Sequence, residues 1–230
     1  MKQIYEGDCM DWLDMQNQSF PLIIADPPDN LKLNYDGFDD NNPHYYDWID
    51  LLIRKTLRVA DCFWLSYYWK HDLEIKHRVR NILKHERPSV KAKTFIWRFT
   101  FGQYTSKDCG SGFRYLLRFT KPTAKFRPDA IREPSARMLI GDSRASGPRV
   151  PDDVWEFPRV VGNAAERRTW HPTQHPESLY SRICSLHSDR SDTVVDLFGG
   201  TGTLFRVRDN ALICEISENY INEIKKEHNL

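Results

Sequence analysis

The sequence predicts an α/β fold built on a mostly parallel sheet. Short apolar segments with the length of buried strands alternate with longer segments of helical periodicity, above all near the two ends of the chain. One strand runs into a glycine-rich turn, as is common where a parallel strand passes into a helix. The 230 residues are 40% hydrophobic, which is enough for one sizeable core. We therefore expect a single domain over residues 1–230.

The first half of the chain contains three predicted strands and two predicted helices. The strands are expected at residues 3–5, 22–25 and 62–67. The second strand ends at Pro27-Pro28, because proline cannot continue a buried strand. Helical spacing of apolar residues over 45–59 involves Trp48, Leu51, Leu52 and Leu57. Another helix is expected at 72–85.

The second half contains four more predicted strands. Residues 94–101 are rich in aromatic residues and threonine, which favours a strand, and another strand is expected at 115–120. Residues 121–170 contain Gly, Pro, Ser and Arg without a clear period, and we expect them to be irregular. The remaining elements are a helix at 177–188, a strand at 193–198, a short helix at 203–207, a strand at 211–215 and a last helix capped by Ser217. The expected total is seven strands.

Composition argues against several classes of protein. The longest apolar run is far short of the ~18 residues that span a membrane, and the first residues lack the apolar core of a signal peptide. The five cysteines are scattered and form no CxxC pair, so neither a disulfide framework nor a metal site is expected. These observations favour a cytoplasmic protein.

Positive charge is concentrated in the middle third of the chain. Residues 84–149 carry 15 basic and 5 acidic side chains, a net charge of +10, although the whole chain has a net charge of only +1. Aromatic residues are interleaved with this charge. The combination suits binding to nucleic acid through phosphates and unstacked bases. A solvated basic face over buried aromatic strands would produce the same pattern.

A glycine-rich turn follows the strand at 193–198. Its sequence is Asp196-Leu197-Phe198-Gly199-Gly200-Thr201-Gly202, and Glu215 ends the next strand. Glycines at the carboxyl end of a strand allow a ligand to approach the backbone, and an acid on the neighbouring strand can accept hydrogen bonds from ribose hydroxyls. Taken alone, this pattern also fits a tight strand-to-helix turn without a ligand.

Two further motifs contain groups suited to chemistry. Asp26-Pro27-Pro28-Asp29 follows a buried strand, and proline makes this turn rigid. The Asp26 carboxylate and the Pro27 carbonyl are placed to accept hydrogen bonds from one amino group. The polar segment His171-Pro172-Thr173-Gln174 precedes the helix at 177–188 and is placed to form the floor of a cofactor pocket. A capping aspartate and a helix N-terminal segment are the plainer explanations of these two motifs.

Together the three motifs resemble those of the permuted (β-class) amino-DNA methyltransferases, which use S-adenosylmethionine. Asp26 to Asp29 is similar to the catalytic Asp-Pro-Pro-Tyr motif, and Asp196 to Gly202 is similar to the Asp-x-Phe-x-Gly-x-Gly cofactor loop. The His-Pro-Thr-Gln segment and Asp8 match as well. The resemblance runs from about residue 3 to about residue 227 and is weaker between 121 and 150. It implies a Rossmann-like, circularly permuted, seven-stranded methyltransferase sheet, and the seven predicted strands agree with that number.

The resemblance also implies the site residues. The catalytic residues would be Asp26, Pro27, Pro28 and Asp29. S-adenosylmethionine would contact Asp8, Cys9, Asp26, His171, Thr173, Gln174, Asp196, Phe198, Gly199, Gly200, Thr201, Gly202, Thr203, Glu215 and Ile216. Residues 121–165 would form an inserted target-recognition region. The partner would be double-stranded DNA with the target base flipped out, and a homodimer is compatible with this expectation.

Two departures from the family pattern bear on the function. Asp29 replaces the aromatic residue that normally stacks on the flipped base. Either another aromatic residue supplies that surface, or the substrate is unusual, or activity is weak or lost; the candidates for the aromatic residue are Tyr35, Tyr45, Tyr46 and Trp170. The helix after Gly202 is short, which could loosen the cofactor pocket. The expected function is methyl transfer to N6 of adenine, as part of DNA methylation and restriction-modification. The alternatives are an N4-cytosine or RNA amino-methyltransferase and a catalytically silent nucleic-acid-binding subunit.

Overall fold

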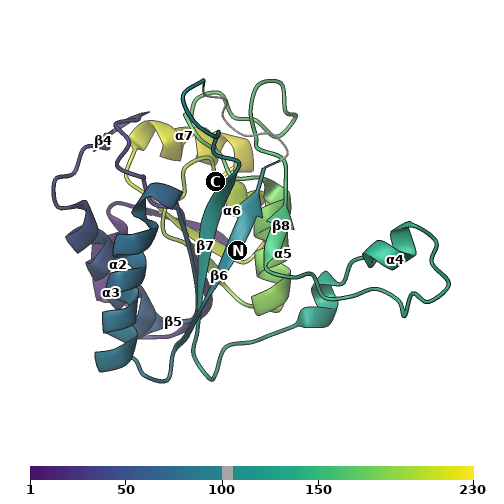
Figure 1. Cartoon of the computed structure of the whole chain (residues 1–230). Helices are drawn as coiled ribbons and strands as arrows, with labels where there is room; N and C mark the ends of the chain where they lie inside the picture. The colour runs from purple at the N-terminus through teal and green to yellow at the C-terminus, as the bar shows by residue number, and fades with distance from the viewer. Residues whose placement is uncertain (100–105) are drawn as a thin grey trace.

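The computed structural model describes residues 1–99 and 106–230 (Figure 1). Within these residues an eight-stranded sheet forms the centre of the molecule. The strands lie in the order β1 (Lys2–Glu6), β10 (Ala211–Glu215), β9 (Val194–Asp196), β2 (Phe20–Ala25), β5 (Ala60–Tyr67), β7 (Phe113–Thr120), β6 (Lys91–Arg98) and β8 (Val154–Glu156). Strand β7 is antiparallel to both of its neighbours, and the other pairs in the sheet are parallel.

The predicted α/β class and the seven expected strands are confirmed, and the sheet has one strand more than predicted. The additional strand β8 lies within residues 121–170, where the expectation of irregular structure is wrong for Val154–Glu156. It is only three residues long, too short for an alternating pattern to be recognised. Tertiary packing defines it, because the ring of Trp155 lies 5.3 Å from that of Trp64 and 5.1 Å from that of Phe95.

Other boundaries differ by a few residues. The strand expected at 94–101 begins earlier, at Lys91, and its last two expected residues, 100 and 101, lie outside the described residues. The short helix α1 (Cys9–Met15), which was not predicted, follows β1 and is capped by Asp8, whose carboxylate accepts the Met10 N–H at 2.8 Å. No helix among the described residues is long and apolar enough to cross a membrane.

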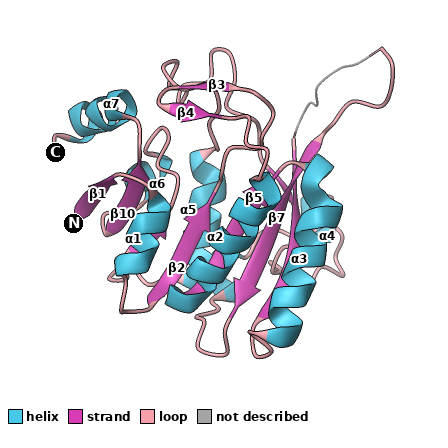
Figure 2. Cartoon of the chain, turned by 90° about the vertical axis from the view of Figure 1, so that its left-hand side faces the viewer, coloured by secondary structure: helices cyan, strands magenta, loops and turns pink. Residues whose placement is uncertain are grey.

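Helices cover both faces of the sheet. Helices α1, α2 (Tyr45–Val59) and α3 (Asp72–His85) lie on one face, in front of the strands in Figure 2. A 3₁₀ turn at Trp69–His71 leads into α3. Helices α5 (Glu177–His187), α6 (Thr203–Val207) and α7 (Glu218–His228) pack on the other face. The strands between them are therefore buried on both sides, which explains their continuous apolar runs.

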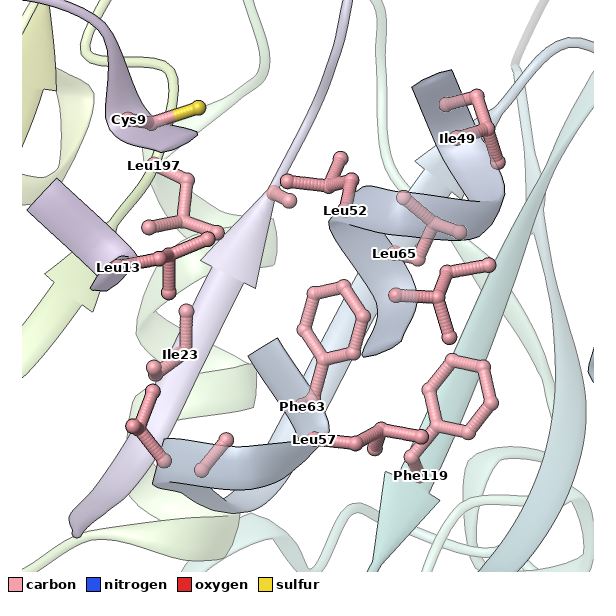
Figure 3. Close-up of a cluster of buried hydrophobic side chains, with 14 of the residues drawn as sticks. Cys9, Leu13, Ile23, Ile49, Leu52, Leu57, Phe63, Leu65, Phe119 and Leu197 are labelled. Atoms are coloured by element: carbon pink, nitrogen blue, oxygen red, sulfur yellow. The ribbon is translucent and has the colours of Figure 1, made fainter. Parts of the chain in front are cut away.

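The core consists of two clusters of buried side chains, one on each face of the sheet, and successive side chains of β2 point alternately into them. Leu22 and Ile24 point to the α5 side, whereas Ile23 and Ala25 point to the α1 and α2 side. Figure 3 shows the cluster on the α1 and α2 side, in which Ile23 and Phe63 of the sheet lie close to Leu13 and Leu52 of the helices.

The order of the strands places a crevice above the middle of the sheet. Strands β9 and β2 are neighbours, although their connections run to opposite sides of the sheet, and ligands of open α/β sheets bind at such a point. The carboxyl ends of β1, β10, β9 and β2 meet at this edge. A small hairpin of β3 (Asn34–Tyr35) and β4 (Phe38–Asp39) lies above the same edge (Figure 2).

Part of the segment between β7 and α5 extends away from the sheet. It contains a 3₁₀ turn at Pro128–Ile131 and the short helix α4 (Ala136–Leu139). We call residues 132–149 the arm; it projects from the body of the molecule in Figure 1. Two backbone hydrogen bonds of 2.9 Å between Glu133 and Arg149 close its base. Near its tip, Leu139 and Ile140 are 75% and 80% exposed.

Candidate functional site

A cleft that is open to solvent lies at the carboxyl edge of the sheet and encloses about 930 Å³. All but two of the residues expected to bind S-adenosylmethionine line it. They are Asp8, Cys9, Asp26, His171, Thr173, Gln174, Phe198, Gly199, Gly200, Thr201, Thr203, Glu215 and Ile216. The fold thus brings residues from both ends of the chain to one cavity, because the ends of β1, β2, β9 and β10 are adjacent in the sheet.

Glu215 connects the glycine-rich loop to the end of β10. Its Oε2 accepts the Gly200 N–H at 2.7 Å, and its Oε1 accepts the N–H groups of Ile216 and Ser217 at 2.9 Å each. Burial raises the pKa of Glu215, although these three hydrogen bonds act in the opposite direction. Gly200 has φ of +50°, and a Cβ there would lie 3.3 Å from the His171 ring. Glycine is therefore required at this point of the loop.

Asp196 and Gly202 are the two expected residues that do not line the cleft, and both support the loop from behind. Asp196 is 1% exposed and accepts hydrogen bonds from the Tyr180 hydroxyl at 3.0 Å and the Phe198 N–H at 3.1 Å. Burial raises the pKa of Asp196 to about 8. Gly202 has φ of +68° and packs on Ile224, which a Cβ at position 202 would approach to 3.2 Å.

A second cavity of about 600 Å³ adjoins the cleft. Its walls include Pro27, Asp29, Trp97, Phe99, Arg114 and Arg159. Five residues line both cavities: Asp26, Tyr35, Thr173, Gln174 and His175. The two prolines of the turn face different spaces: Pro28 lines the cleft and Pro27 lines the second cavity. Asp26 therefore lies where the two spaces meet.

The Asp26 carboxylate is held by two side chains. Its Oδ1 accepts an N–H of Arg114 at 2.8 Å, and its Oδ2 lies 3.2 Å from His175 Nε2. Burial is the largest single influence on Asp26 and opposes its ionisation, but Arg114, His175 and Ser66 together outweigh it, so the pKa of Asp26 lies below its usual value. Burial lowers the pKa of His175 to about 4, so its ring is neutral at pH 7. A neutral ring with hydrogen on Nε2 donates to Asp26.

Asp29 is 7% exposed and its carboxylate is bound to protein groups. Arg114 contacts it with both terminal nitrogens, at 2.5 Å and 3.0 Å, and the Tyr68 N–H donates to it at 3.0 Å. Its carbonyl oxygen lies 2.7 Å from Nε2 of the buried His71. Burial raises the pKa of Asp29, although Arg114 acts in the opposite direction.

Of the aromatic residues considered as replacements for the missing ring, Tyr35 is the one that lines both cavities. Trp170 packs instead against Tyr220, with ring centroids 5.5 Å apart, and lines neither cavity. Tyr45 and Tyr46 pack around His71. Phe99, which was not considered, lines the second cavity beneath the guanidinium of Arg159 at 5.2 Å.

Several residues of the site could not be found from the sequence. Arg114 is the second residue of β7 and Ser66 the last but one of β5, and neither belongs to a motif. The pairing of β5 with β7 brings them to Asp26. His175 directly follows the His-Pro-Thr-Gln segment, and this position in the sequence was the one sign that it could belong to the site. Asp40 accepts the N–H groups of Asn30, Leu31 and Leu33 at 2.7, 3.0 and 3.0 Å and so shapes the loop after the prolines.

Comparison with known families agrees with this geometry. A family model described as DNA methylase, of the N6/N4 group, matches residues 20–226. The chain belongs to this DNA methylase family. The match includes the Asp26 turn, the glycine-rich loop and Glu215, and it covers the residues of both cavities except Gly7, Asp8 and Cys9.

Curated relatives in bacteria span most of the chain. The type II methyltransferase M.HpaI of Haemophilus parainfluenzae is 30% identical over 83% of the chain and 61% of its own length. M.BglII of Bacillus subtilis is 30% identical over 91% of the chain and 63% of its own length. The DNA adenine methyltransferase YhdJ of Escherichia coli is 32% identical over 88% of the chain and 72% of its own length. The chain thus spans about three fifths of the length of the first two relatives.

Solved structures share the fold. The M1.HpyAVI–SAM complex has a TM-score of 0.66 at 20% identity, with all of both chains covered. The PvuII DNA methyltransferase, described as cytosine-N4-specific, has a TM-score of 0.69 at 14% identity over 97% of this chain and 84% of its own. At these identities the likeness concerns the fold alone. The chain therefore has the fold class of these methyltransferases, and its circular permutation stays a prediction.

Proposed function

We propose that this DNA methylase transfers a methyl group from S-adenosylmethionine to N6 of adenine in double-stranded DNA. The observation that carries the proposal is the position of Asp26 between two cavities. The cleft has the glycine-rich loop and the acids Asp8 and Glu215, which suit a nucleoside-containing methyl donor. The second cavity has aromatic and basic walls, which suit a flipped base and its phosphate.

The residues of the cleft fit the cofactor. Gly199 and Gly200 bring the loop backbone to the cleft wall. Oε2 of Glu215 accepts one backbone N–H, so it has a lone pair left for a ribose hydroxyl, whereas Oε1 already accepts two. Trp48, Phe38 and Ile216 give the cleft apolar surface for an adenine ring. When bound, S-adenosylmethionine supplies an electrophilic methyl group, so the protein needs to position the acceptor amine.

Asp26 is the residue that positions the amine. Its carboxylate has about four acceptor sites, of which Arg114 and His175 use two. The others accept N–H of the target amine, with the Pro27 carbonyl as a second acceptor on the side of the base. With both partners bound, the amine nitrogen would bond to the methyl carbon while the carbon–sulfur bond breaks and the sulfur keeps its electron pair. The methylated amine would then lose a proton to solvent. Orientation and electrostatics account for catalysis of this kind.

Two features support adenine as the target. Asp, rather than Ser, begins the Asp-Pro-Pro-Asp turn, and this favours N6 of adenine by resemblance to the family. The name of YhdJ, a relative 32% identical to this chain, states adenine. The recognition of DNA sequence is assigned to residues 121–165. Arg159, Val160 and Val161 of this region line the second cavity, and the arm extends beyond the body of the molecule.

The deciding experiment is the transfer of labelled methyl from S-adenosylmethionine to mixed DNA, followed by analysis of the nucleosides. Label in N6-methyladenine supports the proposal. Label in N4-methylcytosine would assign the other base of the family. If the protein binds DNA and S-adenosylmethionine but transfers no label, it is a silent binding subunit and the proposal is wrong.

A further inference from the structure

We propose that Arg114 is a positioning residue for methyl transfer and that Asp29 acts through it. In this arrangement Asp29 fixes the guanidinium, and the guanidinium fixes the Asp26 carboxylate at the junction of the two cavities. The inference rests on the proposed function, because it assigns a role to residues around the same amine site.

The hydrogen bonds of Arg114 define this arrangement. Its Nε donates to Ser66 Oγ at 2.6 Å, and its two terminal nitrogens grip Asp29 in a fork at 2.5 and 3.0 Å. One terminal nitrogen also donates to Asp26 at 2.8 Å. A guanidinium is planar and rigid. The contacts with Ser66 and Asp29 therefore fix the plane of the group, and with it the direction of the N–H that points to Asp26. Asp29 and Ser66 thus determine where Arg114 holds Asp26.

The environment makes these contacts strong. The side chains of Arg114 and Asp29 are 14% and 10% exposed, and an ion pair with so little solvent is weakly screened. Burial disfavours a charged Arg114, but the two carboxylates outweigh this and raise its pKa. A single arginine therefore bridges a pair of neighbouring acids and separates their negative charges. If it were removed, Asp26 and Asp29 would repel each other, and the pKa of Asp26 would rise.

The ion pair with Arg114 explains why position 29 is an aspartate rather than an aromatic residue. An aromatic ring there could not accept the fork of Arg114, so the guanidinium would have Asp26 as its remaining acid partner. Asp29 is consequently a counter-charge within the protein, and its bound carboxylate is not available to a base. The aromatic function is separate and falls to Tyr35, which lines both cavities.

Titration of Asp26 has to be interpreted with all the groups that face it. These are Arg114 on β7, Ser66 on β5, Asp29 and Tyr35 on the loop after β2, His171 and His175 before α5, Tyr180 on α5 and Asp196 on β9. Among them Arg114 is the cation in direct contact, since His175 is neutral above a pH of about 4.

The test uses Arg114→Met, Asp29→Asn and the double variant, with the pH profile of kcat as the main readout. Arg114→Met should move the acid limb to higher pH by about one unit, because Asp26 becomes harder to ionise, so that kcat at any pH on that limb falls by about tenfold. Adding Asp29→Asn should move the limb back toward wild type, because the neighbouring negative charge is gone. Arg114→Lys keeps the charge and should keep the limb in place, with a lower kcat because the fork is lost.

A purely structural role for Arg114 would give a different result: the acid limb would stay at the wild-type pH in Arg114→Met, and the double variant would be worse than either single variant. Either outcome overturns the proposal. Titration of Asp26 by ¹³C NMR of its carboxyl carbon, in wild type and in Arg114→Lys and Arg114→Met, supplies a readout that needs no turnover. If wild type transfers no methyl, the proposed function fails, while an unchanged Asp26 titration in Arg114→Met would separately disprove the pairing.

Discussion

The Oε2 of Glu215 lies 2.7 Å from the backbone nitrogen of Gly200. This hydrogen bond joins the end of β10 to the loop that follows β9, and both residues line the cleft. The same carboxylate also accepts the N–H groups of Ile216 and Ser217. Glu215 thus fixes the shape of the glycine-rich loop and has one lone pair, on Oε2, left beside the cleft.

Replacing Glu215 should weaken the binding of S-adenosylmethionine. Glu215→Ala removes the ribose acceptor and leaves the Gly200 N–H without its partner, so we expect affinity to fall by at least about tenfold, as for the loss of hydrogen bonds to a charged group. Glu215→Gln keeps one acceptor oxygen and should lose less. Isothermal titration calorimetry measures both. Equal affinity for wild type and Glu215→Ala would disprove the assigned role.

Asp26→Ala should abolish methyl transfer and retain most of the affinity for DNA. Asp26 acts on the amine at the reacting centre, whereas phosphate contacts supply most of the affinity for DNA. Transfer assays and DNA titrations at fixed salt concentration separate the two quantities. Asp61→Ala, a change of the same type at the amino end of β5, away from both cavities, is the matched control. Near-wild-type turnover of Asp26→Ala would show that Asp26 is structural.

Tyr35 should supply the aromatic surface for the target base. Tyr35→Ala is expected to lower kcat/KM on double-stranded DNA by about tenfold or more, since base–aromatic stacking contributes ~1–3 kcal/mol. Tyr35→Phe keeps the ring and should stay close to wild type. Trp170→Ala serves as a control because Trp170 lines neither cavity. A loss of activity in Trp170→Ala that exceeds that of Tyr35→Ala would reverse this assignment.

The arm should contribute to target recognition without supporting the fold. The ends of residues 134–148 are joined by the hydrogen bonds of Glu133 and Arg149, so a short Gly/Ser linker can replace them. We expect unchanged thermal stability and cofactor affinity, with altered target preference. Methylome sequencing of a host that expresses each form measures this preference. Because few residues of 121–165 line the second cavity, the wild-type target should be short or degenerate. A long, strict target, or one unaffected by the deletion, would contradict the prediction.

The buried His187 should make stability fall in acid. Its Nδ1 lies 2.7 Å from the Lys125 carbonyl oxygen, and its Nε2 is buried without a hydrogen-bond partner among the described residues. Burial lowers its pKa to about 4. Since an unfolded histidine has a pKa of ~6.5, protons favour the unfolded chain between these values. His187 therefore costs stability as pH falls from about 6.5 to about 4, by a total on the order of 3 kcal/mol.

Denaturant unfolding as a function of pH tests this expectation. His187→Gln keeps a donor for the Lys125 carbonyl and removes the titration, so its stability should depend less on pH between 6.5 and 4 than that of wild type. His77→Gln, on the exposed side of α3, is the control. Parallel curves for wild type and His187→Gln would show that His187 is not the group responsible.

The sequence by itself determined the order and type of most elements. The helices at Tyr45–Val59 and Asp72–His85 have the predicted bounds, because amphipathic periodicity over three or more turns is a local property of the chain. The glycine-rich loop, the Asp26 turn and Glu215 were also recognisable, since each motif lies at the end of a strand. Once the strands are parallel, their carboxyl ends meet at one edge, and the motifs meet there too.

The tertiary structure decided what the motifs contact. Strand β8 is defined by the packing of Trp155, and the role of Asp29 is defined by an arginine 85 residues away along the chain. Local patterns report on neighbours within a few residues, whereas Arg114 reaches Asp26 and Asp29 only because β7 pairs antiparallel to β5 next to β2. The ionisation of Asp26, the neutrality of His175 and the position of Tyr35 between the two cavities all arise from that long-range pairing and from the burial that it creates.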